Sequence, residues 1–125
     1  MNALKVKKIL SSFKGKDQIC KLFTEKERFL KEDAEELWDE YLEFMTIKTL
    51  GSDTGSNNQM KYSTTYFMDK LWHYHVLCNE LYQEFMVLVN EINPLVDFIH
   101  HSMLLSLDNQ ESKKKRQKAT FRAYQ

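Results

Sequence analysis

The chain has 125 residues, a hydrophobic fraction of 42%, and 18 basic residues balanced by 18 acidic ones. This length predicts one domain, and the balanced charge excludes a global field that would draw nucleic acid or an anionic membrane to the protein. One Pro and three Gly leave few helix breakers. We therefore expect an all-α fold, a compact single-domain bundle of about five to six helices.

The two cysteines, Cys20 and Cys78, lie far apart and form no CxxC motif. No disulfide scaffold is implied, and a reducing compartment is the default for such a chain. The first residues contain no apolar stretch of signal-peptide length, and no run approaches the roughly 18 apolar residues that cross a bilayer. These features favour a cytoplasmic or otherwise intracellular protein without membrane contact.

The first half of the chain predicts two short helices and one long one. Residues 1–32 form an N-terminal helical segment in this interpretation, and residues 33–125 form the main helical domain, the two making one compact unit. The TEKE sequence at 24–27 fits a capping box, in which a Thr hydroxyl and a Glu carboxylate satisfy free backbone N–H groups. The helix that follows, about 33–50, has a wide apolar arc and should be central.

The second half opens with the loop GSDTGSNNQ at 51–59, which has no apolar residue and should be mobile. A helix is then expected from about residue 65 to 90, ending before Pro94 because a residue that precedes proline disfavours the helical conformation. Residues 96–107 are apolar enough for a further helix. The tail from Asn109 contains polar helix formers and should pack back on the body.

The expected helix at 65–90 contains the sequence MDKLWHYHVLCNELYQEF. At 100° per residue, one continuous apolar stripe contains Leu71, His75, Cys78, Tyr82, Phe85 and Val89. His75 is therefore predicted to be a core histidine, and Cys78 a small buried apolar residue. His73 lies about 160° from His75, so a regular helix cannot direct both rings at one metal ion.

Asp69 precedes His73 by four residues and shares its face of the helix. A carboxylate there can accept a hydrogen bond from one imidazole nitrogen and leave the other free. One reading is a polar contact between helices; the other is a metal site completed by His100 or His101. Zinc takes about four ligands, often three from the protein plus water, which Asp69, His73 and His101 or His100 could supply.

Four segments of the chain resemble one family of small helical domains. They are EELWDEYLEFMTIK, STTYFMDKLWHYHVLCNELYQEFM, VDFIHH and KKRQKATFRAY. The family occurs in plant and fungal glycine-rich-domain-containing proteins and in microbial ones, and the resemblance covers roughly residues 34–124. It implies an all-helical domain without a defined reaction, in which a set of residues acts together: Asp69, Trp72, His73, His100 and His101. The sequence departs from the pattern where Thr64, Tyr66, Asn79, Met86 and Met103 replace other residues.

Neither a nucleophile elbow, a phosphate loop nor a dinucleotide-binding glycine motif occurs. The sequence therefore predicts a non-enzymatic protein-interaction or scaffold module without a cofactor, which binds a protein partner through the set named above. The alternative is a zinc-like metal-binding protein or a metal-dependent hydrolase that uses Asp69, His73 and His100 or His101. Nucleic acid is not expected as the main partner, although a weak contact is conceivable through Lys113, Lys114, Lys115 and Arg116.

Overall fold

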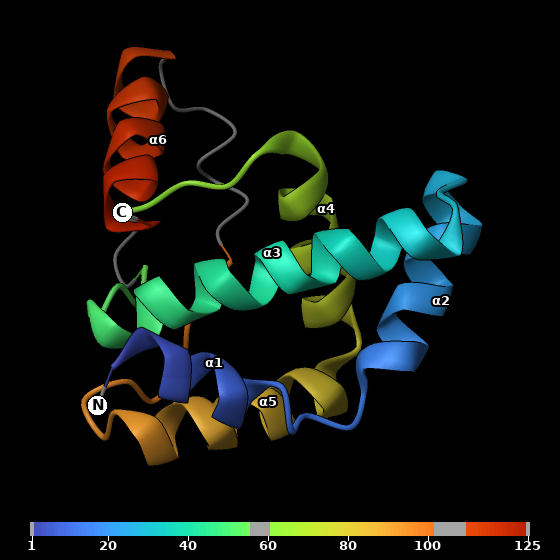
Figure 1. Ribbon diagram of the computed structural model, residues 1–125, viewed down its shortest axis with the longest axis horizontal. Helices are drawn as coiled ribbons and strands as arrows, with labels where there is room; N and C mark the ends of the chain where they lie inside the picture. The colour runs from blue at the N-terminus through green and yellow to red at the C-terminus, as the bar shows by residue number, and fades with distance from the viewer. Residues whose placement is uncertain (1, 56–60, 102–109, 125) are drawn as a thin grey trace.

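The computed structural model describes residues 2–55, 61–101 and 110–124. Within these ranges the chain forms six α-helices and no strand, which confirms the expected all-α bundle (Figure 1). The helices are α1 (Ala3–Leu10), α2 (Lys16–Glu27), α3 (Lys31–Leu50), α4 (Tyr66–Leu77), α5 (Asn79–Ile92) and α6 (Gln110–Tyr124). None of them is long and apolar enough to cross a membrane.

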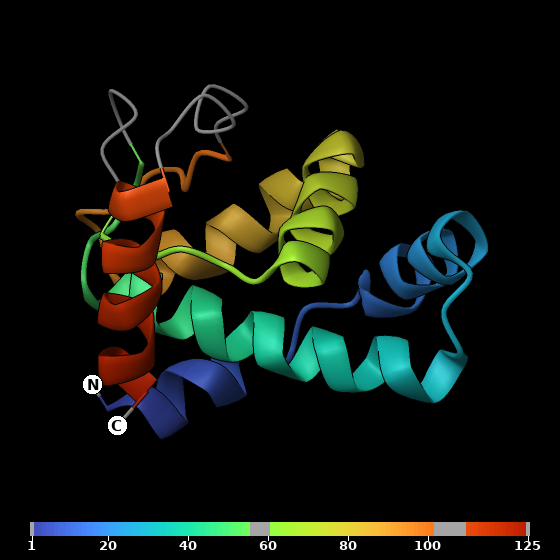
Figure 2. The ribbon, with the colours of Figure 1, turned by 90° about the horizontal axis from the view of Figure 1, so that it is seen from above.

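Helix α3 is the centre of the bundle, as its wide apolar arc predicted. It contacts α1, α2, α4 and α6, and Figures 1 and 2 show it running across the molecule. Its buried side chains include Leu37, Trp38, Tyr41, Phe44 and Met45. Such broad burial means that α3 organises the core.

The N-terminal segment contributes to this same core. Val6 and Leu10 of α1 and Ile19 and Phe23 of α2 are each fully buried in the cluster that also includes α3. Helix α1 begins where the Asn2 side chain accepts a hydrogen bond from the Lys5 amide at 2.9 Å. The two helices therefore pack as part of the bundle.

The predicted capping box at 24–27 is wrong. These residues form the last turn of α2, and the Thr24 hydroxyl donates to the Lys21 carbonyl at 2.8 Å. Helix α2 ends at Glu27, and the next residue, Arg28, caps it with a φ of 58° in the left-handed region. The motif fits a helix start, but here the preceding residues already bury Ile19 and Phe23 and continue the helix through it.

The expected single helix at 65–90 is two helices, α4 and α5, separated at Cys78, where ψ is 70°. The apolar stripe survives on both sides of the break, because Leu71, His75, Tyr82 and Phe85 are all buried. Cys78 itself, predicted to be buried, is only half-buried where the helix breaks. Neither Pro nor Gly marks the break, so the usual sequence signals for a kink are absent. As predicted, α5 ends before Pro94.

The core histidine prediction is confirmed at His75, which is 0% exposed. The Tyr41 hydroxyl lies 2.7 Å from His75 Nδ1, and His75 Nε2 lies 3.4 Å from the Leu81 carbonyl. Since a carbonyl can only accept, Nε2 carries the proton and Nδ1 accepts from Tyr41. Burial lowers the pKa of His75 to about 4, so the ring is neutral in this core.

One of two expectations about connecting segments needs correction. The described part of the predicted helix at 96–107, residues 96–101, is not helical, and 102–109 lie outside the described residues. The predicted loop at 51–59 is confirmed as non-helical over its described residues 51–55, where Asp53 is buried, and 56–60 lie outside the described residues. Hydrogen bonds link both segments to the rest of the chain and to each other, for example from the His100 N–H to the Thr54 carbonyl. The pattern of apolar residues in the sequence does not predict such bonds.

Candidate functional site

Helix α4 presents Asp69, Trp72 and His73 along its first two turns. Trp72 points inward and is 1% exposed, whereas the Asp69 carboxylate is about half exposed. His73 is half-buried between these extremes. The three residues therefore span the boundary between core and solvent, on the side of α4 where residues 99–101 pass.

Asp69 is bonded to His101. Its Oδ1 lies 3.0 Å from His101 Nε2, and the Thr64 hydroxyl donates to the same oxygen at 3.4 Å. Burial disfavours the ionised carboxyl, but the His101 hydrogen bond and charge outweigh it, and the pKa of Asp69 is lowered. The sequence placed Asp69 with His73, and the structure shows that its imidazole partner is His101.

The buried Trp72 ring packs against the His101 ring. The two rings meet edge to face with centroids 4.7 Å apart, and the Trp72 indole N–H donates to the Tyr82 hydroxyl at 3.0 Å. Tyr82 in turn donates to the Ile99 carbonyl. This buried chain of hydrogen bonds ties α4, α5 and the segment before His101 together.

His100 does not join the cluster. Its backbone N–H donates to the Thr54 carbonyl at 2.8 Å, and its exposed ring packs on Phe98 with centroids 4.9 Å apart. Adjacent side chains on a non-helical segment point to different sides, so one of the pair faces inward. That residue is His101, one of the two that the sequence left open.

His73 and His101 lie side by side, with ring centroids 5.5 Å apart. Their charges act on Asp69, since both lower its pKa. Across the part of the chain that the structure describes, no group of three or more His, Cys, Asp or Glu side chains is arranged to hold a metal ion. The expected set Asp69, His73 and His101 is thus brought together as a polar cluster, with its carboxylate bonded directly to a ring nitrogen.

A buried ion pair lies next to Trp72, and the sequence did not predict it. Lys48 Nζ lies 2.8 Å from Asp53 Oδ2, and these side chains are 0% and 2% exposed. The Lys48 ammonium also lies 5.3 Å from the Trp72 ring centroid and 5.1 Å from that of Phe44. Burial lowers the pKa of Lys48, although the Asp53 charge and hydrogen bond act in the opposite direction.

Asp53 also bonds to the backbone of the segment that leads into α4. Its two oxygens also accept the backbone N–H groups of Lys61 at 2.9 Å and Tyr62 at 3.1 Å. One carboxylate thus joins the end of α3 to the chain that leads into α4. A lone Asp in a Ser-, Gly- and Asn-rich stretch has no pattern that marks it as buried, so the sequence does not predict its pairing with Lys48.

The sequence matches no family model, and comparison with curated proteins and with solved structures finds no significant match. The resemblance to the helical domain of glycine-rich-domain-containing proteins therefore stays a prediction.

Proposed function

We propose that the protein is a non-enzymatic interaction module that binds a protein partner through an aromatic surface at the start of α4. The observation that carries this proposal is the exposure of two adjacent aromatic side chains, Tyr66 at 65% and Phe67 at 44%. Their rings meet edge to face at 5.1 Å. We call Tyr66, Phe67 and the neighbouring Phe29 the aromatic surface.

This surface is continuous with the core. Phe67 packs on Phe29 with ring centroids 4.9 Å apart, and Phe29 packs on the fully buried Phe23 at 4.7 Å. The row of rings therefore holds the outermost aromatic side chains in place before any partner arrives. Aromatic anchors that are fixed in this way lose little conformational entropy on binding, and they dominate the energetics of many interfaces.

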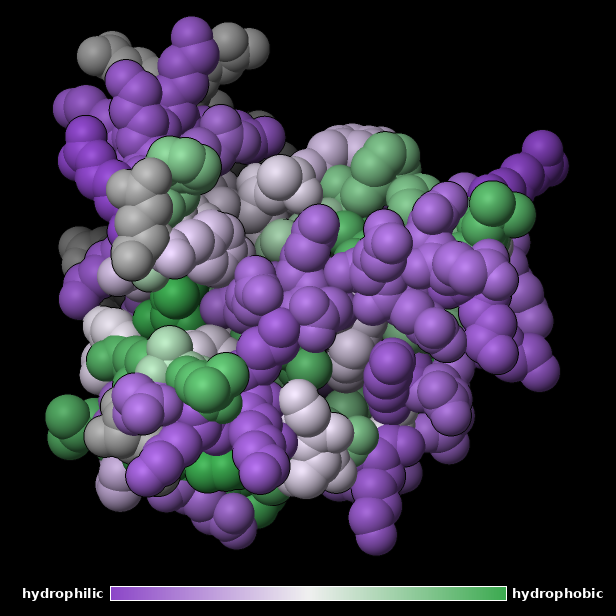
Figure 3. Space-filling model, viewed as in Figure 1, coloured by the Kyte–Doolittle hydropathy of each residue, from purple (hydrophilic) through white to green (hydrophobic). Residues whose placement is uncertain are grey.

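Polar groups surround the aromatic surface. Lys70 Nζ lies 5.1 Å from the Tyr66 ring centroid and 3.0 Å from Glu27 Oε1. Leu30, one residue after Phe29, adds an apolar side chain that is 68% exposed. In Figure 3, hydrophobic surface appears near the start of α4 and at the α2–α3 junction, with hydrophilic surface between. Aromatic residues with a charged rim are typical of the centre of a protein interface.

The polar cluster has a structural role in this proposal. Asp69 and His101 fasten residues 99–101 to α4 and so fix the helix that presents the aromatic surface. The direct bond between Asp69 and His101 supports this reading, and no catalytic step is proposed.

Metal binding by Asp69, His73 and His101 is the second candidate function. The 5.5 Å separation of the His73 and His101 rings motivates it, because two imidazoles that share a zinc ion must place ligating nitrogens about 2 Å from it, although the described side chains form no group of three arranged to hold a metal ion. A zinc-dependent hydrolase would build on the same three side chains. Elemental analysis of purified protein separates the two candidates.

We place the protein in a reducing, intracellular compartment. Cys20 and Cys78 are both free thiols, and burial raises the pKa of Cys20 to about 11. A buried thiol with a raised pKa forms little thiolate and reacts slowly.

The test of the interaction proposal is site-specific photocrosslinking in cells, with a photoreactive phenylalanine analogue at position 66. The matched control carries the analogue at Leu95, which is 83% exposed and lies outside the aromatic surface. A partner that crosslinks from position 66 and not from position 95 supports the proposal. Equal crosslinking from both positions, or none from position 66, contradicts it.

A further inference from the structure

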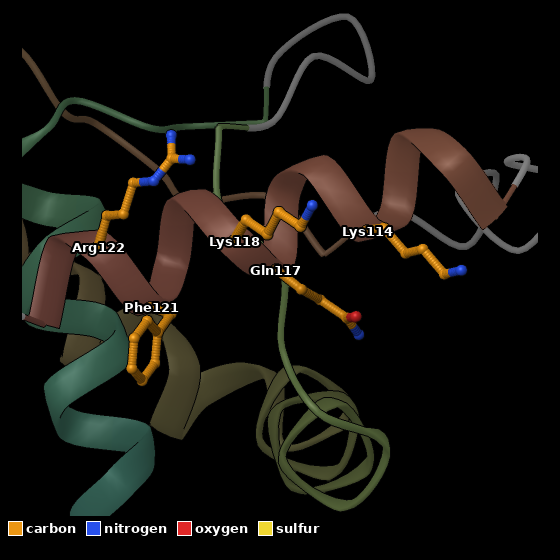
Figure 4. Close-up of a pocket in the computed structure, with 5 residues that line it drawn as sticks. All are labelled: Lys114, Gln117, Lys118, Phe121 and Arg122. Carbon is orange, nitrogen blue, oxygen red and sulfur yellow. The ribbon is translucent and has the colours of Figure 1, made fainter.

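One side of α6 bears a stripe of charged and aromatic side chains that the interaction surface does not use. Five residues line a shallow surface hollow of about 340 Å³: Lys114, Gln117, Lys118, Phe121 and Arg122. Their spacing of three and four residues places them on one side of a helix. Figure 4 shows them along α6, with Gln117 and Phe121 on one edge and Arg122 on the other.

The opposite side of α6 holds the helix to the body. The Thr120 hydroxyl accepts the Ser63 backbone N–H at 2.8 Å, and Thr120 is 6% exposed. Arg116, one turn earlier on the same side, is half-buried, and its charge lowers the pKa of Lys48. Of the four basic residues at 113–116, therefore, Arg116 faces the helical bundle. The exposed basic side chains of α6 continue beyond residue 116 with Lys118 and Arg122.

The charges of the stripe are regularly spaced. Lys114, Lys118 and Arg122 follow one another at four-residue intervals, which is a rise of about 6 Å per step along the helix. Lys114, Lys118 and Arg122 are all exposed, and α6 projects beyond the other helices in Figure 1. A row of evenly spaced cations fits a partner that carries regularly spaced negative charges along its backbone, as a nucleic-acid strand does.

Phe121 adds a second, independent feature. It is 65% exposed and lies between Lys118 and Arg122 on the stripe. One exposed ring among cations is a poor membrane anchor, because interfacial helices need a broad apolar face. An acidic peptide would satisfy the cations but stacks on Phe121 only where it carries an aromatic side chain, whereas every nucleobase offers a flat ring face.

We propose that this stripe binds single-stranded nucleic acid without sequence preference. Lys114, Lys118 and Arg122 contact successive phosphates, and a base stacks on Phe121. Because the charges of the whole chain balance, long-range attraction is weak and binding depends on these few local contacts. The inference is independent of the aromatic surface on α4.

The test measures fluorescence anisotropy of a labelled 20-nucleotide oligouridine as the full chain is added, at several salt concentrations. Three phosphate contacts predict a slope of about −2 for the logarithm of the binding constant against that of salt, from about −0.7 per phosphate. The variant Lys114→Glu/Lys118→Glu should bind at least tenfold more weakly. The control Lys14→Glu/Lys21→Glu makes the same charge change at exposed positions off α6 and should bind like the wild type.

Variants of Phe121 test the stacking contact. Phe121→Leu keeps an apolar side chain without a ring and should weaken binding about tenfold with an unchanged salt slope, whereas Phe121→Tyr should bind normally. The side chain is mostly exposed, so circular dichroism should show all these variants folded.

Several results would overturn the proposal. They are no binding at 50 mM salt, equal binding by Phe121→Leu, and equal loss in the Lys14/Lys21 control. Binding to a duplex, to polyglutamate or to phosphatidylserine vesicles as tight as to oligouridine would also reject it. So would salt-sensitive self-association that Lys114→Glu/Lys118→Glu abolishes, because the stripe would then pair with the acidic residues of α3 in a second copy.

Discussion

The Lys48 ammonium and the Asp53 carboxylate form a fully buried ion pair, 2.8 Å apart, between the end of α3 and the chain that leads to α4. Removal of either partner leaves the other charge buried and uncompensated, which typically costs 3–5 kcal/mol. The pair lies under Trp72, whose ring centroid is 5.3 Å from Lys48 Nζ. The buried ion pair therefore packs against Trp72, the residue of α4 that also contacts His101.

We expect Lys48→Met and Asp53→Asn each to lower the free energy of unfolding by about 3 kcal/mol. The double variant should lose much less than the sum, because neither charge is left alone. Urea denaturation of the four proteins measures this coupling. The surface cluster of Lys7 with Asp39 and Glu43, each 3.0 Å away, is the control, and Lys7→Met should cost less than about 1 kcal/mol. Additive losses at Lys48 and Asp53 would show that the pair is not coupled.

The buried neutral His75 predicts a pH dependence of stability. Its folded pKa of about 4 lies below the ordinary value of 6.5, so the unfolded chain binds the proton more readily between these values. Stability must then fall as the pH drops from 6.5 towards 4, by about 3 kcal/mol from this residue.

Unfolding free energies of wild type and His75→Gln at several pH values isolate this contribution. The wild type should lose more stability than His75→Gln as the pH falls from 6.5 to 4. His100→Gln, which alters an exposed ring, should keep the wild-type slope. Parallel curves for wild type and His75→Gln would disprove the burial argument.

The bond between Asp69 and His101 should contribute modestly, because the carboxylate is about half exposed. We expect Asp69→Asn to lower the free energy of unfolding by about 1 kcal/mol at neutral pH, with a smaller loss below the ordinary carboxyl pKa of 3.8. The sign follows from the lowered pKa, since such a carboxyl stabilises the fold when ionised and loses this effect on protonation. Glu84→Gln on the exposed side of α5 is the control and should change little.

The metal alternative has its own measurement. If the cluster is structural, purified protein contains no stoichiometric transition metal, and its melting temperature is the same with and without chelator. Asp69→Asn, His73→Gln and His101→Gln should then leave metal content unchanged. One equivalent of zinc that these substitutions remove would establish the metal site instead.

Periodicity was sufficient to predict the helices that bury a regular apolar face, such as α3. It placed His75 in the core correctly, because burial repeats every three to four residues on either side of Cys78. It did not predict the break at Cys78, which no helix-breaking residue marks. It also failed at residues 96–101, where an apolar composition suited a helix but hydrogen bonds from Tyr82 and His100 hold a non-helical segment.

The sequence predicted which residues form the candidate site, but not which imidazole bonds to Asp69. Helical spacing related Asp69 to His73, yet contacts across a loop are not constrained by spacing, so the partnership with His101 required the structure. Asp53 could not be found at all, because its burial depends on Lys48 and two backbone N–H groups. A polar side chain can be buried where it forms hydrogen bonds or ion pairs with partners distant in sequence, and the residues around it in the sequence do not reveal those partners.

The most direct test of the central claim measures binding of the partner identified by crosslinking to purified wild type, Tyr66→Lys and Leu95→Lys. Tyr66→Lys places a charge where the aromatic surface should meet the partner, and we expect at least tenfold weaker binding, as for the loss of an interface anchor. Leu95→Lys adds the same charge at another exposed apolar position and should bind like the wild type. Equal affinities for all three proteins would contradict the account.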